Sequence, residues 1–231
     1  MAFARAVVLT GGPTHDFPAT TGCLSTLLRE QGLVAESYED VNDGLRALPG
    51  APLLVVNALR WTMRAPGTPE RYRVRADDEG VSVAPDARAA LAVHLEGGGV
   101  LAMHTAIICF DDWPEWAATL GGAWRWGRSS HPPLGEMAVE VAAPGHPLVA
   151  GLADFSIVDE RYSDLDCGPD PIAPLLVADG LPLLWVRGHG NGRVVYDALS
   201  HQPASYAVPE HREIVCRAIR WASGADAEET A

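Results

Sequence analysis

The sequence predicts an α/β protein built on a doubly wound parallel sheet. Three observations support this fold class: short continuous apolar runs, helical patterns between them, and glycine-rich turns directly after the runs. Strands of a parallel sheet are apolar throughout because helices cover both faces of the sheet. After Gly121 the strand patterns follow one another with little helix between them, which adds an antiparallel β extension to the predicted sheet.

The first half of the chain alternates between strands and helices. We expect strands at residues 6–9, 34–38, 52–57 and 100–104. A helix with Cys23, Leu24, Leu27 and Leu28 on its apolar face should end at Gly32, and a second helix should cover residues 85–96. This order is typical of βαβ units.

The second half is richer in strands. We expect strands at residues 136–141, 155–158, 175–177, 183–186 and 194–199, and a final helix at residues 209–221. The segment 60–84, rich in Arg, Pro and Gly, is predicted to be an irregular insertion of the kind that forms lids or mobile loops. We therefore expect one domain over residues 1–224, followed by a flexible tail at residues 225–231.

Composition excludes several functions. The 231 residues carry a net charge of −13 and include no Lys, which excludes Schiff-base, pyridoxal-phosphate and phosphate-loop chemistry. A strongly acidic surface repels phosphate backbones and anionic lipids, so no nucleic-acid or membrane partner is expected. No secretion or anchoring signal is visible, and the four cysteines are too scattered for a disulfide framework. These features predict a cytoplasmic protein with free thiols.

Histidines follow three of the predicted strands. Ligands of a parallel sheet bind beyond the carboxyl ends of its strands, and His15, His104 and His201 stand there. The run Val100 to Ala106 has the strand-to-helix form of a nucleophile elbow, but with His104 where Ser or Cys would stand. Thr105 lacks an evident activating base, so acyl-enzyme chemistry is not expected.

A cluster of ionisable residues closes another extended segment. It runs from Asp159 through Glu160 and Arg161 to Tyr162, and it suggests a Glu160 carboxylate oriented by the guanidinium of Arg161. Together with the three strand-end histidines, a carboxylate here could hold a divalent metal such as zinc. The candidate ligands are His15, His104, Glu160 and His201.

Four segments taken together resemble the ThuA-like, or trehalose-utilisation, family. They cover residues 11–16, 97–106, 159–162 and 190–201, in order along nearly the whole chain. The resemblance implies the class I glutamine amidotransferase-like fold, with a flavodoxin-like doubly wound sheet. It also implies a role in bacterial sugar catabolism, on keto-derivatives of disaccharides and glycosides. True amidotransferases carry Cys at the elbow and His followed by Pro and Glu later. His104 and the sequence His201-Gln202-Pro203 therefore predict no glutaminase activity.

These observations assign roles to ten residues. The predicted catalytic residues are His104, Glu160, His201 and Asp16, and the predicted substrate-binding residues are His15, Tyr162, Trp113, Trp126, His131 and Thr105. Simpler interpretations stand beside these. Asp16 would also serve as a helix cap, the tryptophans as core residues, and His104 as a buried histidine bonded to backbone.

The leading hypothesis is a sugar-processing enzyme that uses acid/base or metal-assisted lyase, hydrolase or isomerase chemistry on a keto-sugar or glycoside. The alternative is a non-catalytic carbohydrate-binding or accessory protein on the same scaffold. The expected partner is a small-molecule sugar in both cases. The sequence also leaves open a homo-oligomer formed through the antiparallel extension or the insertion.

Overall fold

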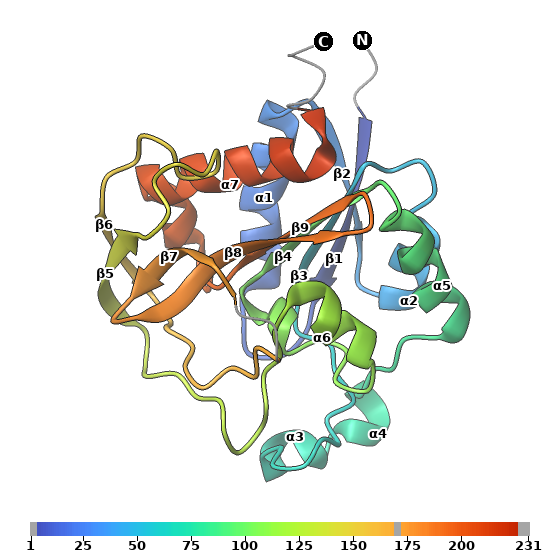
Figure 1. Cartoon of the computed structure of the whole chain (residues 1–231). Helices are drawn as coiled ribbons and strands as arrows, with labels where there is room; N and C mark the ends of the chain where they lie inside the picture. Colours follow the sequence, from blue (N-terminus) through green and yellow to red (C-terminus); the bar gives the residue numbers. More distant parts are fainter. Residues whose placement is uncertain (1–3, 169–171, 226–231) are drawn as a thin grey trace.

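The computed structural model describes residues 4–168 and 172–225, and its strands form one nine-stranded sheet (Figure 1). The strand order is β2-β1-β3-β4-β9-β8-β7-β5-β6. From β2 to β9 neighbouring strands are parallel, and from β9 to β6 they are antiparallel. The predicted α/β class is confirmed, with the expected parallel part and antiparallel extension.

The parallel strands form the centre of the molecule. They are β1 (Ala4–Gly11), β2 (Leu33–Tyr38), β3 (Leu53–Ala58), β4 (Gly99–Met103) and β9 (Gly192–Asp197). Every residue of β3 and β4 is buried, which explains why their sequences are apolar without alternation except at Asn57, whose side chain bonds to Thr20 and Thr21.

The antiparallel strands are β5 (Gly135–Val141), β6 (Phe155–Asp159), β7 (Pro174–Ala178) and β8 (Leu181–His189). In β6 buried and exposed residues alternate, as expected for a strand with one face in solvent. The strand β8 turns directly into β9 through a hairpin, so the antiparallel part is joined edge to edge with the parallel part.

Helices cover both faces of the sheet (Figure 1). On one face lie α1 (Phe17–Glu30) and α7 (Pro209–Ser223), and on the other lie α2 (Val41–Arg46) and α5 (Pro85–His94), which pack against each other. The helix α6 (Pro114–Leu120) contacts β8 and β9. Single 3₁₀ helices, η1 (His104–Ile107) and η2 (Pro203–Ala207), follow β4 and β9. Within the described ranges, no helix is long and apolar enough to cross a membrane.

The insertion at residues 60–84 is more regular than expected. It contains two one-turn helices, α3 (Glu70–Arg73) and α4 (Ala76–Glu79), below the sheet in Figure 1. Trp61 is fully buried and its ring lies 5.2 Å from that of Tyr72, so aromatic packing fixes the segment on the domain. The predicted tail lies outside the described residues from residue 226 onward.

Candidate functional site

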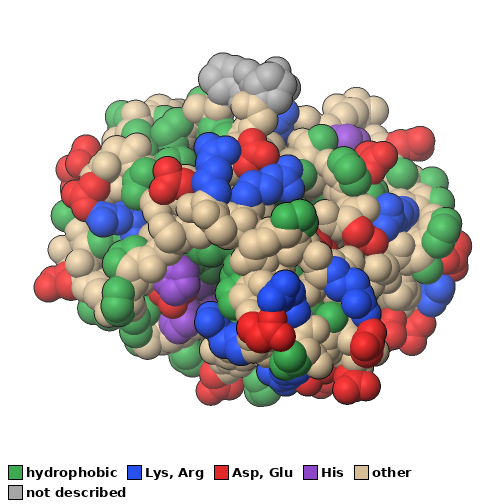
Figure 2. Space-filling model, turned by 90° about the horizontal axis from the view of Figure 1, so that it is seen from below, with side chains coloured by type: hydrophobic (Ala, Val, Ile, Leu, Met, Phe, Trp, Pro, Cys, Tyr) green, Lys and Arg blue, Asp and Glu red, His purple; other side chains and the backbone are tan. Residues whose placement is uncertain are grey.

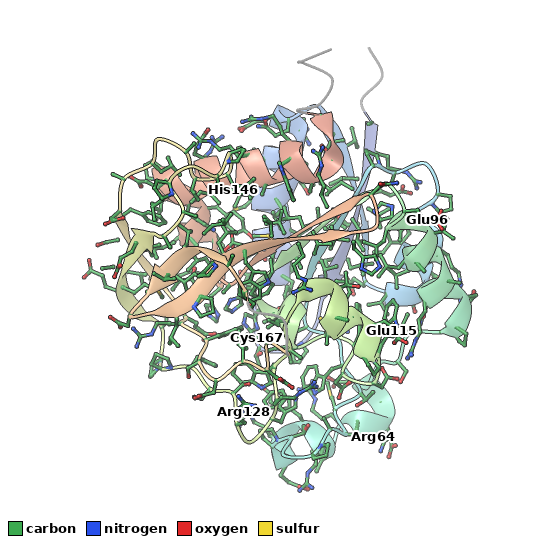
Figure 3. All side chains as sticks on the ribbon, in the orientation of Figure 1. Arg64, Glu96, Glu115, Arg128, His146 and Cys167 are labelled. Carbon is green, nitrogen blue, oxygen red and sulfur yellow. The ribbon has the colours of Figure 1, made fainter. Side chains whose placement is uncertain are left out.

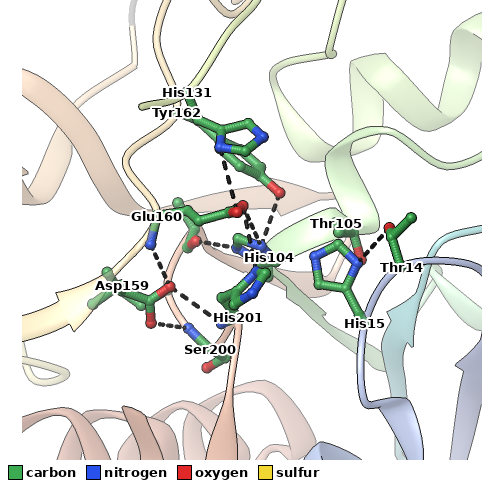
Figure 4. Close-up of polar contacts among 12 residues, drawn as sticks. Thr14, His15, His104, Thr105, His131, Asp159, Glu160, Tyr162, Ser200 and His201 are labelled. Carbon is green, nitrogen blue, oxygen red and sulfur yellow. Dashed lines mark hydrogen bonds and ion pairs between the residues drawn. The ribbon is translucent and has the colours of Figure 1, made fainter. Parts of the chain in front are cut away.

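Four of the predicted residues converge at the carboxyl ends of the strands. His104 directly follows β4 and Glu160 directly follows β6, while His15 and His201 lie on the loops after β1 and β9. One nitrogen of each histidine and one oxygen of Glu160 all lie within 4.8 Å of one another (Figure 4). Seen from this end, histidine side chains gather in a hollow with an acidic group between them (Figure 2).

The backbone holds His104 in an unusual conformation. Its φ of +44° lies in the left-handed region, which costs a non-glycine residue roughly 1–3 kcal/mol. The Tyr196 hydroxyl donates to the His104 carbonyl at 2.8 Å, and His104 Nδ1 donates to the Ala198 carbonyl at 2.7 Å. These bonds from β9 and the loop after it maintain the strained turn and fix the tautomer, because Nδ1 must carry the proton.

The other nitrogen of His104 faces the cluster. Its Nε2 accepts a hydrogen bond of 2.9 Å from the Tyr162 hydroxyl and lies 3.3 Å from Glu160 Oε2. His104 and Tyr162 are both about 2% exposed. Burial raises the pKa of Tyr162 well above its ordinary value, so this phenol stays protonated and remains a donor.

Glu160 is surrounded by imidazoles. His104 Nε2 and His201 Nδ1 lie 3.3 and 3.4 Å from its Oε2, and His131 Nδ1 lies 3.4 Å from its Oε1. Burial alone would raise the pKa of Glu160, but the interactions with His104 and His201 lower it below the ordinary value. The carboxylate in turn raises the pKa of His201. Glu160 is thus an anion held at the centre of a nitrogen-rich site.

The predicted orienting role of Arg161 is wrong. Its guanidinium pairs with Asp179 and is therefore directed to another partner, although it adjoins Glu160 in sequence. Adjacent residues of an extended segment point to opposite sides, which separates the two side chains.

His15 presents a free lone pair to the same cluster. Its Nδ1 donates to the Pro13 carbonyl at 3.4 Å, and its buried Nε2 has no hydrogen-bond partner among the described residues. Its ring centroid lies 4.6 Å from that of His201 and 5.3 Å from that of His104. Burial and these two histidines lower the pKa of His15 to about 4, so the ring is neutral at physiological pH.

Asp159 has a structural role that is not among the predicted site roles. Its buried carboxylate accepts from the backbone N–H groups of Ser200 (2.8 Å), His201 (3.2 Å) and Glu160 (2.8 Å), and from the Ser205 hydroxyl (2.6 Å). It therefore joins the end of β6 to the loop that carries His201. The alternation along β6, with Phe155 and Ile157 also buried, is the signal that places Asp159 inside.

The structure does not bring Asp16 or Thr105 into the cluster. Asp16 is exposed, and its Oδ1 accepts from Ala19 N at 3.1 Å as the N-cap of α1. The Thr105 hydroxyl is buried and donates to the Ala58 carbonyl at 2.7 Å. The hydrogen bonds of both side chains are to backbone groups outside the cluster. The catalytic role predicted for Asp16 and the substrate-binding role predicted for Thr105 stay predictions.

The aromatic neighbours of the site differ from those predicted. Trp113 is buried against Phe110 and Trp116, and Trp126 stacks on Trp61 at 5.8 Å. Both pack within the protein. Trp124 instead lies beside the cluster, with its ring 5.1 Å from Tyr162 and 6.0 Å from His131.

The remaining histidines are distant or structural. His146 lies beside α7, where its ring is 6.1 Å from that of Trp221 (Figure 3). His94 Nε2 lies 2.9 Å from the Gly99 carbonyl oxygen, and His189 lies at the exposed β8–β9 hairpin. His211 is buried in α7, with its Nε2 2.9 Å from Asp197 Oδ2.

Solved structures share this fold. A ThuA-like protein from Parabacteroides merdae superposes with a TM-score of 0.73 at 19% identity, covering 96% of this chain and 90% of its own. A protein from Salmonella typhimurium LT2, described as cytoplasmic, superposes with a TM-score of 0.67 at 15% identity. The match covers 94% of this chain and 99% of the Salmonella chain. A GMP synthase-type protein from Thermoplasma acidophilum superposes with a TM-score of 0.58 at 14% sequence identity, and the match covers 100% of both chains. At these identities the likeness shows the fold alone.

No curated protein matches the sequence. The model of the ThuA family, described as trehalose utilisation, matches residues 5–222, which is nearly the whole chain. The family description suggests a role in trehalose utilisation. The chain belongs to the ThuA family.

Proposed function

We propose that the protein is a sugar-catabolic enzyme that acts on a keto-sugar or glycoside at a divalent-metal centre. The convergence of His15, His104, Glu160 and His201, with their ligand atoms within 4.8 Å of one another, carries this proposal. The ThuA family description supports a sugar substrate. The strand order β2-β1-β3-β4-β9 supports a flavodoxin-like scaffold, and the Salmonella relative supports a cytoplasmic location.

The donor set fits a cation such as zinc. In His15 and His104 the Nδ1–H groups donate to backbone carbonyls, so the Nε2 atoms face the cluster. A cation bound at His104 Nε2 would replace the hydrogen bond from the Tyr162 hydroxyl and leave that hydroxyl available to substrate. Metal-binding histidines are held in this way by second partners. The unpartnered, buried Nε2 of His15 is the kind of atom that a metal would satisfy. Three histidine nitrogens would then hold the ion and leave a coordination position open to substrate.

The residues around the ion would perform proton transfer. When bound, the cation polarises a substrate carbonyl and stabilises the charge that develops beside it. Glu160, anionic and buried, takes the proton from the carbon next to that carbonyl. The Tyr162 hydroxyl donates to a sugar oxygen, and half-exposed His131 passes the proton from Glu160 to solvent. Lyase, hydrolase and isomerase reactions of keto-sugars can all begin with this proton abstraction.

The test is turnover of 3-keto-disaccharides by wild type, His104→Ala and Glu160→Gln, all prepared without a polyhistidine tag. We expect both variants to lose at least about 100-fold in kcat, the contribution typical of a general base. His189→Ala and Glu96→Gln are matched controls at exposed positions and should retain full activity. Full activity in both site variants would refute the proposal. Sugar binding without turnover in wild type would favour an accessory binding protein instead.

A further inference from the structure

A second cavity lies directly beside the histidine cluster. Its volume is about 490 Å³, within the usual range for small-molecule sites, and it shares His15 with the cluster. The loop after β1 forms one wall, and Arg60, Met63, Arg75 and Glu79 of the 60–84 insertion form the other. We propose that this cavity, the Arg60 pocket, binds the second sugar ring of a disaccharide-type substrate while the keto-sugar ring occupies the cluster. The inference rests on the proposed function and deepens it.

Among the described residues of this pocket, Arg60 has an unpartnered side chain, and it is the residue that we expect to bind the ligand. Its Nε is buried with no hydrogen-bond partner, and within residues 4–168 and 172–225 its guanidinium makes no ion pair. Its backbone is fixed, because its N–H donates to Cys109 Sγ at 3.3 Å and its carbonyl accepts from Phe110 N at 2.9 Å. The guanidinium that extends from this fixed backbone has a fork of donors that matches neighbouring hydroxyl groups of a sugar.

The end of β1 and the loop after it leave room for that guanidinium. A Cβ on Gly11 would lie 2.6 Å from Arg60 Nη2, and a Cβ on Gly12 would lie 2.4 Å from the Leu59 carbonyl oxygen. Both glycines have positive φ angles, +91° and +132°. Only glycine permits this close approach of the loop to the end of β3. The close approach leaves the arginine head against bare backbone at the pocket wall.

The charges of the pocket favour a neutral ligand. Arg75 and Glu79 neutralise each other through an ion pair of 2.6 Å, and Glu39 and Arg60 add one charge of each sign to the lining. With two arginines and two glutamates in its lining, the pocket carries no net charge that would attract a phosphate or carboxylate. Phe17, Pro18 and Met63 add apolar surface suited to the C–H face of a sugar ring. A polyhydroxylated, uncharged ring satisfies both kinds of surface.

The position of His15 connects the two compartments. It lines the Arg60 pocket and also offers its Nε2 to the cluster, so two linked rings can lie on its two sides. Arg60 would therefore select for substrates with a second ring without touching the reacting atoms. It is a specificity residue, in contrast to Glu160.

The first arm of the test is binding, which does not depend on turnover. Titration calorimetry with trehalose and with methyl α-glucoside should show tighter binding of trehalose to wild type. Arg60→Gln should weaken trehalose binding about tenfold or more, the effect of losing hydrogen bonds to a charged group, and leave methyl α-glucoside unchanged. Arg64→Gln is the matched control, because Arg64 lies in the same insertion, is exposed and pairs with Asp77 (Figure 3). Equal affinity of wild type for the two sugars, or inorganic phosphate binding more tightly than trehalose, would overturn the inference.

The second arm compares the 3-keto derivatives of the same two sugars as substrates. Arg60→Gln should raise KM for the disaccharide about tenfold, with kcat and metal content close to wild type. An equal loss for both substrates would contradict selection of the second ring. If wild type turns over neither substrate, the proposed function fails, while the binding arm still decides the role of the Arg60 pocket.

Discussion

The Nε2 atom of His104 lies 3.3 Å from Oε2 of Glu160, although 55 intervening residues separate the two in sequence. Both side chains are almost completely buried, at 2% and 8% exposure for the whole residues. Burying a carboxylate costs free energy, because its charge loses its hydration, and neighbouring groups must compensate for this cost. Here the offset comes from His201 and His131, which also approach Glu160.

Replacing Tyr162 by Phe should impair turnover without loss of metal. The hydroxyl is a protonated donor beside His104, and in the proposed mechanism it donates to a sugar oxygen, so its removal takes away one hydrogen bond to substrate. We expect kcat to fall about tenfold to 100-fold. Steady-state kinetics with a 3-keto-disaccharide would measure this. Tyr38→Phe, whose hydroxyl donates to Glu36 Oε1 in the edge strand β2, is the control and should match wild type. Unchanged kcat in Tyr162→Phe would remove the phenol from the mechanism.

Replacing Asp159 by Asn should destabilise the fold. In the wild type, the Asp159 carboxylate accepts from three groups of the segment after β9. An Asn side chain replaces one carboxylate oxygen by an NH₂ group, which cannot accept, so at least one buried donor loses its acceptor. We expect the free energy of unfolding to fall by about 2 kcal/mol or more, as measured by urea denaturation. The exposed Asp154 accepts a single bond from Val141 N, and Asp154→Asn should change stability by less than about 1 kcal/mol. Equal stability of the two variants would contradict this role of Asp159.

The buried pair of His211 and Asp197 should make stability depend on pH. Burial would lower the pKa of His211, but the charge of Asp197 and their hydrogen bond raise it above its ordinary value. The charged pair therefore stabilises the folded state fully below about pH 6.5, and this contribution disappears as pH rises through the raised pKa. The stability difference between wild type and His211→Asn, measured by urea denaturation, should shrink with increasing pH. A difference that grows with pH would reverse the sign and contradict the assignment.

Zinc should raise the melting temperature of the wild-type protein. A ligand that binds the folded state alone stabilises it according to its concentration and affinity. His15→Ala and His201→Ala should abolish most of the shift in differential scanning fluorimetry, because each removes a nitrogen from the cluster. His146→Ala, beside α7, should retain the full shift. A shift that persists in both cluster variants would place the zinc elsewhere.

The site could be predicted in part because strand ends are visible in sequence. His15, His104 and His201 each follow an apolar run, and parallel strands bring such positions to one edge. The ionisable residues around Glu160 in the sequence indicate its role, yet the adjacent Arg161 pairs with Asp179. Strand alternation would have placed Asp159 inside and Arg161 on the side away from Glu160.

Other assignments depended on packing that no local pattern reveals. Trp113, Trp124 and Trp126 lie close together in sequence, but only contacts across the fold show that Trp124 adjoins Tyr162 and His131. Arg60 was not predicted, because its significance arises from Gly11, a residue of a different strand end. For Asp16 the structure shows the N-cap bond at the start of α1, which is the simpler of its two interpretations.

Metal analysis of untagged protein tests most directly whether this cluster holds a divalent cation. Inductively coupled plasma mass spectrometry of wild type, Glu160→Gln and His104→Ala, each saturated with zinc and then desalted, would give the bound metal per chain. We predict a stoichiometric cation in wild type and Glu160→Gln that is lost in His104→Ala. Wild type without metal, or His104→Ala with as much metal as wild type, would contradict this prediction.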